Sequence, residues 1–298
     1  MSAELNVDRR ENLGAEEFAE SYVARRRPVL VKNALAGSSA LSRWDFDHLR
    51  ERAEARIVPL KTLSESGIKV TNQRLDDYLD GLEAFEKHAA SAGSDRPSAP
   101  AYLHDIPLTA LLPNAQEDLE QFPTDYFPAW YGERWPQFAQ VFLGPTHSLT
   151  PLHFDCLLTH NLFFQIRGRK RFVLIAHDEL KYCYPSRWRW CEIDVEKPDY
   201  ERFPLYRHAR PAEVVVEPGD CLYMPPGTLH HVRGLDCALS FNVDWHTRES
   251  AAQGVFAAAR GMPLKNVYYN AIIALGLWTG ASAQRLFPYY RSYLSYIS

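Results

Sequence analysis

Short β-rich runs, separated by turn signals, extend from about residue 140 to residue 248. They are QVFLG, TPLHFDCLL, NLFFQIRGRKRFVLIA, AEVVVEPGDCLYMPPGTLHHV and ALSFNVDW. Strands of this length, separated by turn signals at regular intervals, predict an antiparallel sandwich or barrel. Within this region, NLFFQI and KRFVLI flank RGR and predict a hairpin with Gly168 at its turn.

Helical spacing of apolar residues is found on both sides of this β-rich region. The pattern predicts helices over 15–26, 42–55 (with Ser42 as N-cap) and 74–89, a strand over 27–34, a flexible loop over 90–101, and helices again after 249. We therefore expect an N-terminal α/β region (1–139) that packs on a β core (140–248), followed by a C-terminal helical segment (249–298).

The composition is typical of a soluble globular protein. Of 298 residues, 46% are hydrophobic and 23% charged, and the net charge of −4 gives no electrostatic reason to expect nucleic acid or a membrane as partner. The apolar run AIIALGLW (271–278) is too short to span a bilayer. Five cysteines without a CxxC pair, and a start without a signal-peptide pattern, indicate reduced thiols in a cytoplasmic protein.

A metal site is the first candidate for chemistry. Residues i and i+2 of a strand point to the same face, so His153 and Asp155 can direct an imidazole and a carboxylate to one point. Alone, this pair equally fits a partly exposed polar strand. A third ligand from HHV (230–232), where only one of His230 and His231 can face the site, would complete the two-histidine, one-carboxylate triad of non-haem Fe(II) oxygenases.

Two further strands carry polar residues that an internal site would use. Lys170 shares a face with Phe172 and Leu174, and a lysine on an apolar face needs an anion. The alternative is a solvated lysine beside a turn. In ALSFNVDW, one face is apolar and the other carries Ser240, Asn242 and Asp244, which predicts either a wet face or a polar barrel interior.

Taken together, these motifs resemble the JmjC-type, cupin-like 2-oxoglutarate oxygenases. The resemblance extends in particular to the asparaginyl hydroxylase that inhibits hypoxia-inducible factor and to its bacterial relatives. The matching pieces occur in the family's order over about residues 15–248: EEFAESYVARRRPVLVKNAL, TPLHFD, NLFFQIRGRKRFVLI, KPDYERFP, EPGDCLYMPPGTLHHV and SFNVDW. The resemblance implies a mainly β fold with flanking helices, built on a double-stranded β-helix (jelly-roll) core.

The resemblance also implies an iron site. His153, Asp155 and His230 match the family's ligands, and His230 is preferred to His231 because the ligand histidine lies five residues after the proline that matches Pro225. The cosubstrate, 2-oxoglutarate, chelates the iron with its keto-acid end.

Other family residues hold the cosubstrate. Lys170 matches the lysine that pairs with the distal carboxylate of 2-oxoglutarate, and Thr150 and Tyr102 match hydroxyl groups of the same pocket. Asn161 and Asn242 match asparagines that line the site. The segment CYPSRWRWCEID (183–194), with Trp188 and Trp190, does not match closely, so the family's substrates are not implied.

The expected activity is hydroxylation of an unactivated C–H bond with Fe(II), 2-oxoglutarate and O2, yielding succinate and CO2. A protein or peptide side chain is the first expected substrate, and a small metabolite or biosynthetic peptide the second. Demethylation and hydroxylation of a transfer-RNA base are less favoured. A metal-binding cupin scaffold or sensor without catalysis is the alternative of another class.

The apolar C-terminal segment suggests a homodimer interface or, alternatively, packing on the protein's own barrel.

Overall fold

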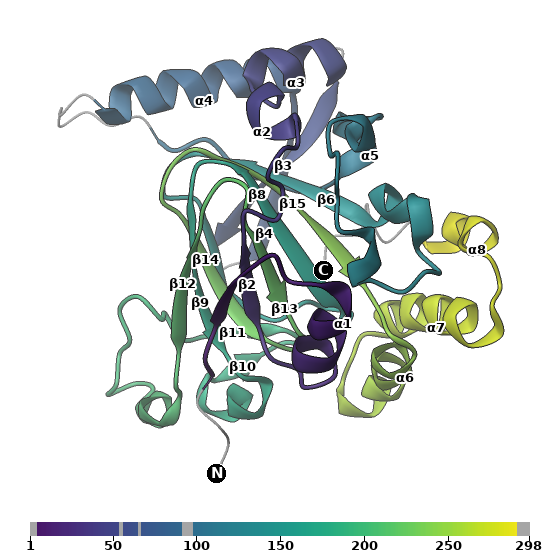
Figure 1. The fold of residues 1–298 in the computed structure, drawn as a ribbon. Helices are drawn as coiled ribbons and strands as arrows, with labels where there is room; N and C mark the ends of the chain where they lie inside the picture. Colours follow the sequence, from purple (N-terminus) through teal and green to yellow (C-terminus); the bar gives the residue numbers. More distant parts are fainter. Residues whose placement is uncertain (1–4, 54–55, 65–66, 91–97, 291–298) are drawn as a thin grey trace.

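The computed structural model describes residues 5–53, 56–64, 67–90 and 98–290, and its centre is formed by two β-sheets that face each other (Figure 1). The seven-stranded sheet has the order β1 (Asp8–Glu11), β2 (Val29–Lys32), β13 (Cys221–Met224), β8 (His160–Arg167), β15 (Ala238–Trp245), β6 (Ala139–Gly144), β5 (Leu103–Pro107). The six-stranded sheet has the order β10 (Pro185–Ser186), β11 (Trp190–Cys191), β7 (Leu149–His153), β14 (Leu229–Gly234), β9 (Lys170–Ile175), β12 (Ala212–Val216).

The chain crosses from one sheet to the other at most turns of the core. β6, β8, β13 and β15 belong to the first sheet, and β7, β9, β12 and β14 to the second. This antiparallel double layer is the expected jelly roll. The predicted hairpin is wrong, because β8 pairs with β13 and β15 whereas β9 pairs with β12 and β14. Gly168 lies at a corner between the sheets, with a positive φ of 64°.

The strands at the centre of the seven-stranded sheet are buried on both faces. On β15, one face contributes Leu239, Phe241, Val243 and Trp245 to the main apolar cluster, which also contains residues of the helices. The other face carries Ser240, Asn242 and Asp244 between the sheets, each at most 5% exposed. The polar face of this strand is therefore a polar barrel interior rather than a wet surface.

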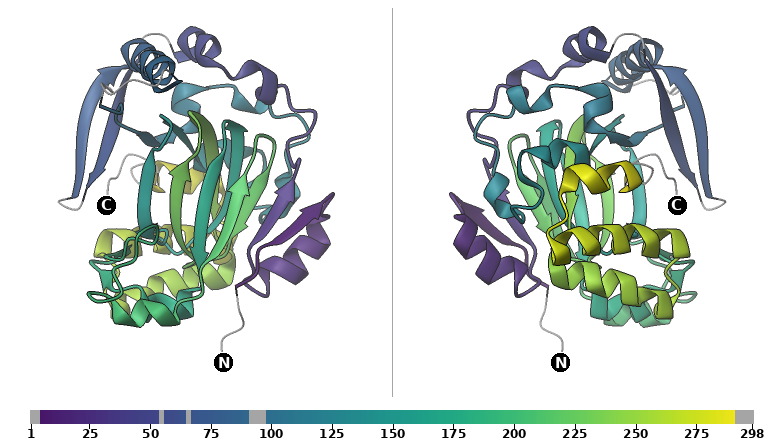
Figure 2. Two further views of the ribbon diagram at one scale, coloured as in Figure 1. Left: turned by 90° about the vertical axis from the view of Figure 1, so that its left-hand side faces the viewer. Right: turned by 90° about the vertical axis from the view of Figure 1, so that its right-hand side faces the viewer.

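Helices cover the outer face of the seven-stranded sheet, and Figure 2 shows the C-terminal ones lying across it. The α-helices are α1 (Ala15–Phe18), α2 (Ala40–Arg43), α3 (Phe46–Ala53), α4 (Leu75–Ala90), α5 (Leu108–Leu111), α6 (Arg248–Phe256), α7 (Leu264–Thr279) and α8 (Ala283–Tyr290). A π-helix (Ala19–Val23) continues α1, and 3-10 turns occur at Ala115–Glu117, Thr124–Tyr126, Gly132–Phe138, His177–Tyr182, Pro204–His208 and Ala257–Arg260.

The helix predicted over 42–55 is divided in two. α2 ends at Arg43, and α3 starts after Asp45, whose Oδ1 accepts a hydrogen bond from the backbone N–H of His48 at 2.9 Å. Ser42 lies inside α2, so Asp45 rather than Ser42 caps the longer helix. Of the predicted loop and C-terminal segment, residues 91–97 and 291–298 lie outside the described residues.

A two-stranded ribbon, β3 (Ile57–Ser64) and β4 (Gly67–Arg74), is a feature that the sequence pattern does not predict. Lys61 of β3 exchanges two backbone hydrogen bonds with Tyr102, at 2.8 and 2.9 Å. This bridge ties the ribbon to the open edge of the barrel and brings both side chains to the same cavity.

All five cysteines are free thiols, and four of them are buried. Among the described helices, none combines the length and apolar character that crossing a membrane requires.

Candidate metal centre and cosubstrate cavity

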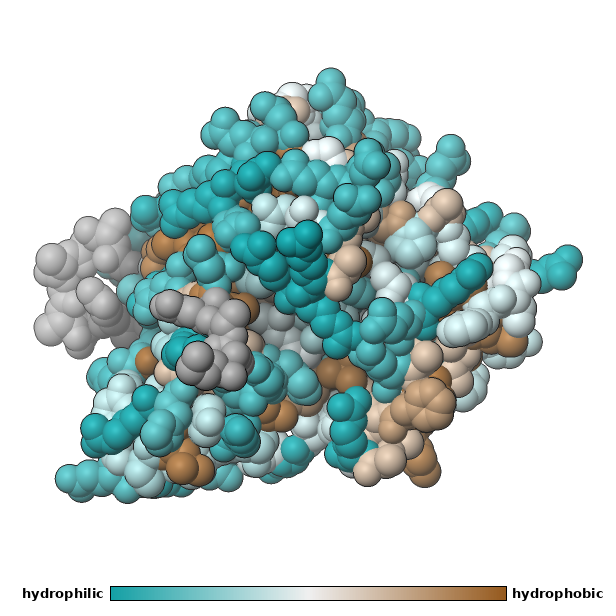
Figure 3. Space-filling model, turned by 60° about the horizontal axis from the view of Figure 1, so that its bottom comes forward, coloured by the Kyte–Doolittle hydropathy of each residue, from teal (hydrophilic) through white to brown (hydrophobic). Residues whose placement is uncertain are grey.

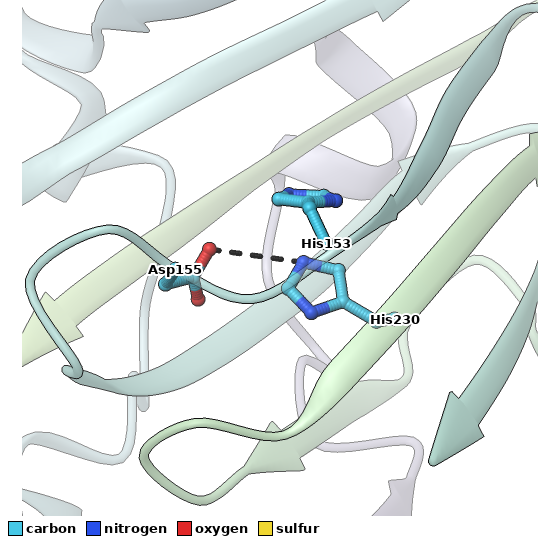
Figure 4. A group of neighbouring side chains, drawn as sticks. All are labelled: His153, Asp155 and His230. Atoms are coloured by element: carbon cyan, nitrogen blue, oxygen red, sulfur yellow. Dashed lines mark ion pairs between the residues drawn. The ribbon is translucent and has the colours of Figure 1, made fainter. Parts of the chain in front are cut away.

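Three side chains from β7, the residues after it, and β14 converge between the sheets (Figure 4). One ligand atom each from His153, Asp155 and His230 lies within 4.8 Å of the others. His153 and His230 are direct cross-strand partners, and Asp155 follows the end of β7 rather than lying in it. The distance from His230 Nε2 to Asp155 Oδ1 is 3.7 Å. The two histidines and the carboxylate singled out in the sequence thus form one cluster.

The backbone fixes the tautomers of both histidines. His153 Nδ1 lies 2.8 Å from the carbonyl of Pro151, and His230 Nδ1 lies 3.0 Å from that of Thr228. A carbonyl only accepts, so each Nδ1 carries the proton and each Nε2 keeps a free lone pair. Burial lowers the pKa of His153 well below its ordinary value, and the charges of His230 and Arg189 add to this effect. A neutral imidazole with Nε2 free is the form that binds a metal.

Lys170 lies in the same cavity, on the face of β9 that points between the sheets. Its Nζ donates to Tyr102 Oη and Ser240 Oγ, both at 2.8 Å, and lies 5.1–5.4 Å from the ring centres of Tyr102, Phe142 and Phe163. Within the described residues it has no carboxylate at ion-pair distance. Burial lowers the pKa of Lys170 to about 7. The lysine is therefore a buried, desolvated cation that an anionic ligand would stabilise, not a solvated one.

Thr150 is buried beside a network that the motifs did not reveal. Its Oγ1 lies 3.4 Å from His104 Nε2, and Asp105 Oδ2 lies 2.8 Å from His104 Nδ1 and 3.0 Å from Lys61 Nζ. A register shift in β5 and a φ of 60° place Asp105 in the cavity wall. Burial opposes the charge of Asp105, but His104 and Lys61 outweigh it and hold its pKa well below the ordinary value. In the stretch AYLHD, which contains His104 and Asp105, the sequence analysis singled out only Tyr102.

Asn161 and Asn242 also line the cavity. Asn161 Nδ2 donates to Asp155 Oδ2 at 3.0 Å and so orients the carboxylate of the triad. Asn242 Nδ2 donates to Asp244 Oδ1 at 3.1 Å. All eight site residues predicted from the sequence therefore meet around one cavity of about 70 Å³.

The segment 183–194 forms the wall on the side of His153. Trp190 stacks on the His153 ring at 4.9 Å, and the Arg189 guanidinium lies 4.5 Å from the Trp190 ring centre. Both residues line the cavity, whereas Trp188 packs in the apolar cluster behind it.

The residues present fit both groups that the sequence suggested. Two imidazoles that can present Nε2 and one carboxylate form a donor set that suits Fe(II). The buried Lys170 with its two hydroxyl partners suits the far carboxylate of 2-oxoglutarate. The fold and the cavity define a jelly-roll protein with a cluster of two histidines and one carboxylate that could hold a metal ion.

The chain belongs to the cupin-like domain family, whose profile matches residues 15–251. Among curated proteins it is similar to Jumonji C domain-containing protein 5 of Drosophila melanogaster (31% identity over 77% of this chain). It is also similar to lysine-specific demethylase JMJ30 of Arabidopsis thaliana, with 29% identity over 80% of this chain. A third relative is 2-oxoglutarate and iron-dependent oxygenase JMJD4 of Gallus gallus, with 26% identity over 80% of this chain. The matches cover 57%, 54% and 59% of those proteins, so the chain spans just over half of each relative.

Proposed function

We propose that the protein is an Fe(II)- and 2-oxoglutarate-dependent dioxygenase that hydroxylates an unactivated C–H bond. One observation carries the proposal: a single cavity is lined by the triad His153, Asp155 and His230 and by Lys170. Lys170 is buried and has no carboxylate partner among the described residues. The printed names of relatives, an iron- and 2-oxoglutarate-dependent oxygenase and a lysine-specific demethylase, support the same chemistry.

The roles of the residues follow from their contacts. His153, Asp155 and His230 would hold the iron, and Asn161 would keep the Asp155 carboxylate in place. Lys170 and Tyr102 would bind the far carboxylate of the cosubstrate, with Thr150 beside them. When bound, iron, 2-oxoglutarate and O2 supply the oxidation, with succinate and CO2 as co-products. The rings of Phe142 and Phe163 would shield the Lys170 end of the cavity from water.

The substrate that we propose first is a protein or peptide side chain, because relatives named as lysine demethylases act on one. A small metabolite is the second candidate. A metal-binding scaffold without catalysis would have no use for a buried, desolvated Lys170, and that residue favours the enzyme.

Substitution of a metal ligand tests the proposal. His153→Ala should lower 2-oxoglutarate-dependent succinate formation at least about 100-fold, since even partners of metal ligands contribute 10–100-fold. His147→Ala, which removes an exposed histidine of the same segment, is the matched control and should leave the rate unchanged.

A second measurement does not require turnover. Under anaerobic conditions, Fe(II) with 2-oxoglutarate should give the protein a weak visible charge-transfer band, and the His153→Ala variant should lack it. Absence of the band in the unmodified protein, or succinate formation that survives in His153→Ala, would contradict the proposal. Mass spectrometry of peptides and metabolites, scoring a gain of one oxygen atom, would then identify the substrate.

We also propose a cytoplasmic location, supported by the five free thiols.

We further propose that a homodimer forms through α7. One face of α7 contributes Tyr269, Ile272, Ile273 and Leu277 to the protein's own core. The other carries a stripe of exposed apolar residues at helical spacing, Leu264, Tyr268, Leu275 and Trp278. Figure 3 shows hydrophobic side chains gathered on the side where the C-terminal helices lie. A stripe of this kind favours association.

A further inference from the structure

A cleft separate from the metal cavity lies on the helix-covered side of the seven-stranded sheet. Its volume is about 610 Å³, which is within the size range of small-molecule sites. The π-helix Ala19–Val23, the segment 128–130 and the start of α6 border it, and π-helical turns are frequent at functional sites. None of its lining residues also lines the metal cavity. The proposed function therefore leaves this cleft without a role.

The sides of the cleft are mostly apolar. Val23, Pro128, Trp130 and Leu277 contribute to them. The indole N–H of Trp130 donates a hydrogen bond to the carbonyl of Ala281 at 2.7 Å, and this bond holds the ring in place. An apolar group that enters the cleft is removed from water against a preformed surface, which favours binding.

The rim of the cleft carries an arginine without a carboxylate partner. Arg248 Nε donates to the carbonyl of Leu277 at 2.8 Å, and no acidic side chain of the described residues lies within 4.0 Å of its guanidinium. Glu249, the acidic residue of the rim, is already paired with Arg26 at 3.3 Å and accepts a hydrogen bond from Gln253 at 3.0 Å. The two arginines and one glutamate leave the rim with a net positive charge.

The floor of the cleft contains a buried histidine with one unsatisfied nitrogen. His160 is 3% exposed, and its Nδ1 lies 2.7 Å from Tyr223 Oη. Tyr223 is fully buried and its hydroxyl has no other acceptor among the described residues, so it donates to Nδ1. Burial lowers the pKa of His160 well below its ordinary value, and the charges of His246 and Arg26 lower it further. The neutral ring therefore carries its proton on Nε2, a donor that has no partner within the described part of the chain.

We propose that this cleft binds a small carboxylic acid with an apolar body, such as an aromatic monocarboxylate. A carboxylate only accepts hydrogen bonds, which matches the unsatisfied donors of Arg248 and His160. The apolar body matches the sides of the cleft, and the negative charge matches its rim. The inference is independent of the proposed function, because it uses no residue of the metal cavity.

The test compares two probes that share an apolar body, naphthalene-2-carboxylate and the neutral naphthalene-2-carboxamide. Calorimetric titration of the full chain measures both affinities. The carboxylate should bind at least about tenfold more tightly than the carboxamide, and Arg248→Gln should abolish this preference. Ala129→Trp, at an exposed alanine that lines the cleft, should weaken binding of both probes at least about tenfold by filling the space.

Two controls separate this cleft from other cationic sites. Arg25→Gln removes the same charge from an exposed arginine outside the cleft, and Lys170→Met removes the cation of the metal cavity. Both variants should keep the preference for the carboxylate. Absence of binding to the unmodified protein, equal binding of the two probes, a preference that survives Arg248→Gln, or one that is lost in Lys170→Met would each overturn the inference. Arg248 and Ala129 are exposed, so both variants should fold, which circular dichroism checks, and each decides independently of the other.

Discussion

The ammonium group of Lys170 is enclosed by three aromatic rings and held by two hydroxyl groups. Because burial lowers its pKa to about 7, the protein without cosubstrate loses this charge as the pH rises past neutrality. In the proposed function, the 2-oxoglutarate dianion binds the charged form. Binding must therefore restore the proton, and the affinity depends on pH.

The dissociation constant of 2-oxoglutarate should increase about tenfold for each pH unit above about 7. Below that pH it should level off, because Lys170 is then already protonated. Calorimetric titration of the Mn(II)-loaded protein between pH 6 and pH 9 measures this. Lys170→Met should bind about 100-fold more weakly at pH 6 and show no such slope. A slope that persists in Lys170→Met would assign the proton to another group.

At the level of residues, strand spacing placed His153 and Asp155 on one face, but the choice of His230 over His231 and a role for Lys170 depended on the resemblance to a family. The sequence did not indicate Asp105, His104 or Lys61. Their meeting depends on a bulge in β5 and on the bridge between Lys61 and Tyr102, which join segments distant in the chain. Likewise, nothing in ALSFNVDW distinguishes Asp244 from a solvated aspartate until the second sheet covers it.

The corner between β8 and β9 connects the two sheets, and Gly168 makes it possible. A Cβ on Gly168 would lie 2.3 Å from the carbonyl oxygen of Cys237, at a φ that L-residues rarely adopt. Gly37 has a φ of 86° but nothing within 4 Å of its Cβ position. The two glycines therefore separate the effect of the close contact from that of backbone strain.

Gly168→Ala should lower the free energy of unfolding by about 3 kcal/mol, and Gly37→Ala by about 1 kcal/mol. Urea denaturation followed by tryptophan fluorescence measures both. Equal effects of the two substitutions would mean that the backbone at Cys237 moves away without cost, and that this corner does not constrain the position of Lys170.

At the level of elements, the β-rich runs between turn signals predicted most core strands but not their pairing partners. NLFFQI and KRFVLI follow each other with a turn between them, which favours pairing of the two strands. In the jelly roll they belong to different sheets, and β8 pairs with β13 while β9 pairs with β14. β3 and β4 escaped prediction because they form a ribbon with much exposed surface, such as Ile57 at 67% and Val70 at 38%, and their sequences mix polar and apolar residues on both faces.

For the whole molecule, the exposed apolar stripe on α7 is the surface through which we propose that two copies associate. Replacing Leu264 and Leu275 together by glutamate should convert a dimer to a monomer, as measured by sedimentation velocity, because two buried charges would face each other across the interface. Both side chains are more than half exposed, so the fold of the monomer should be unaffected. Leu205→Glu, at a 47% exposed leucine on another element, is the control. A monomeric unmodified protein would contradict the dimer.

The wall formed by Trp190 and Arg189 has a consequence for how this protein could change over evolution. The proposed metal ligands lie on or beside β7 and β14, inside the six-stranded sheet, whereas this wall lies on or beside the short strands β10 and β11, a ribbon at the edge of that sheet. Mutation or exchange of the ribbon can reshape what the cavity admits while leaving the ligands in place. The proposed metal ligands and the wall beside them are thus inherited on separate pieces of the chain, and a designer could graft a new ribbon without rebuilding the proposed metal site.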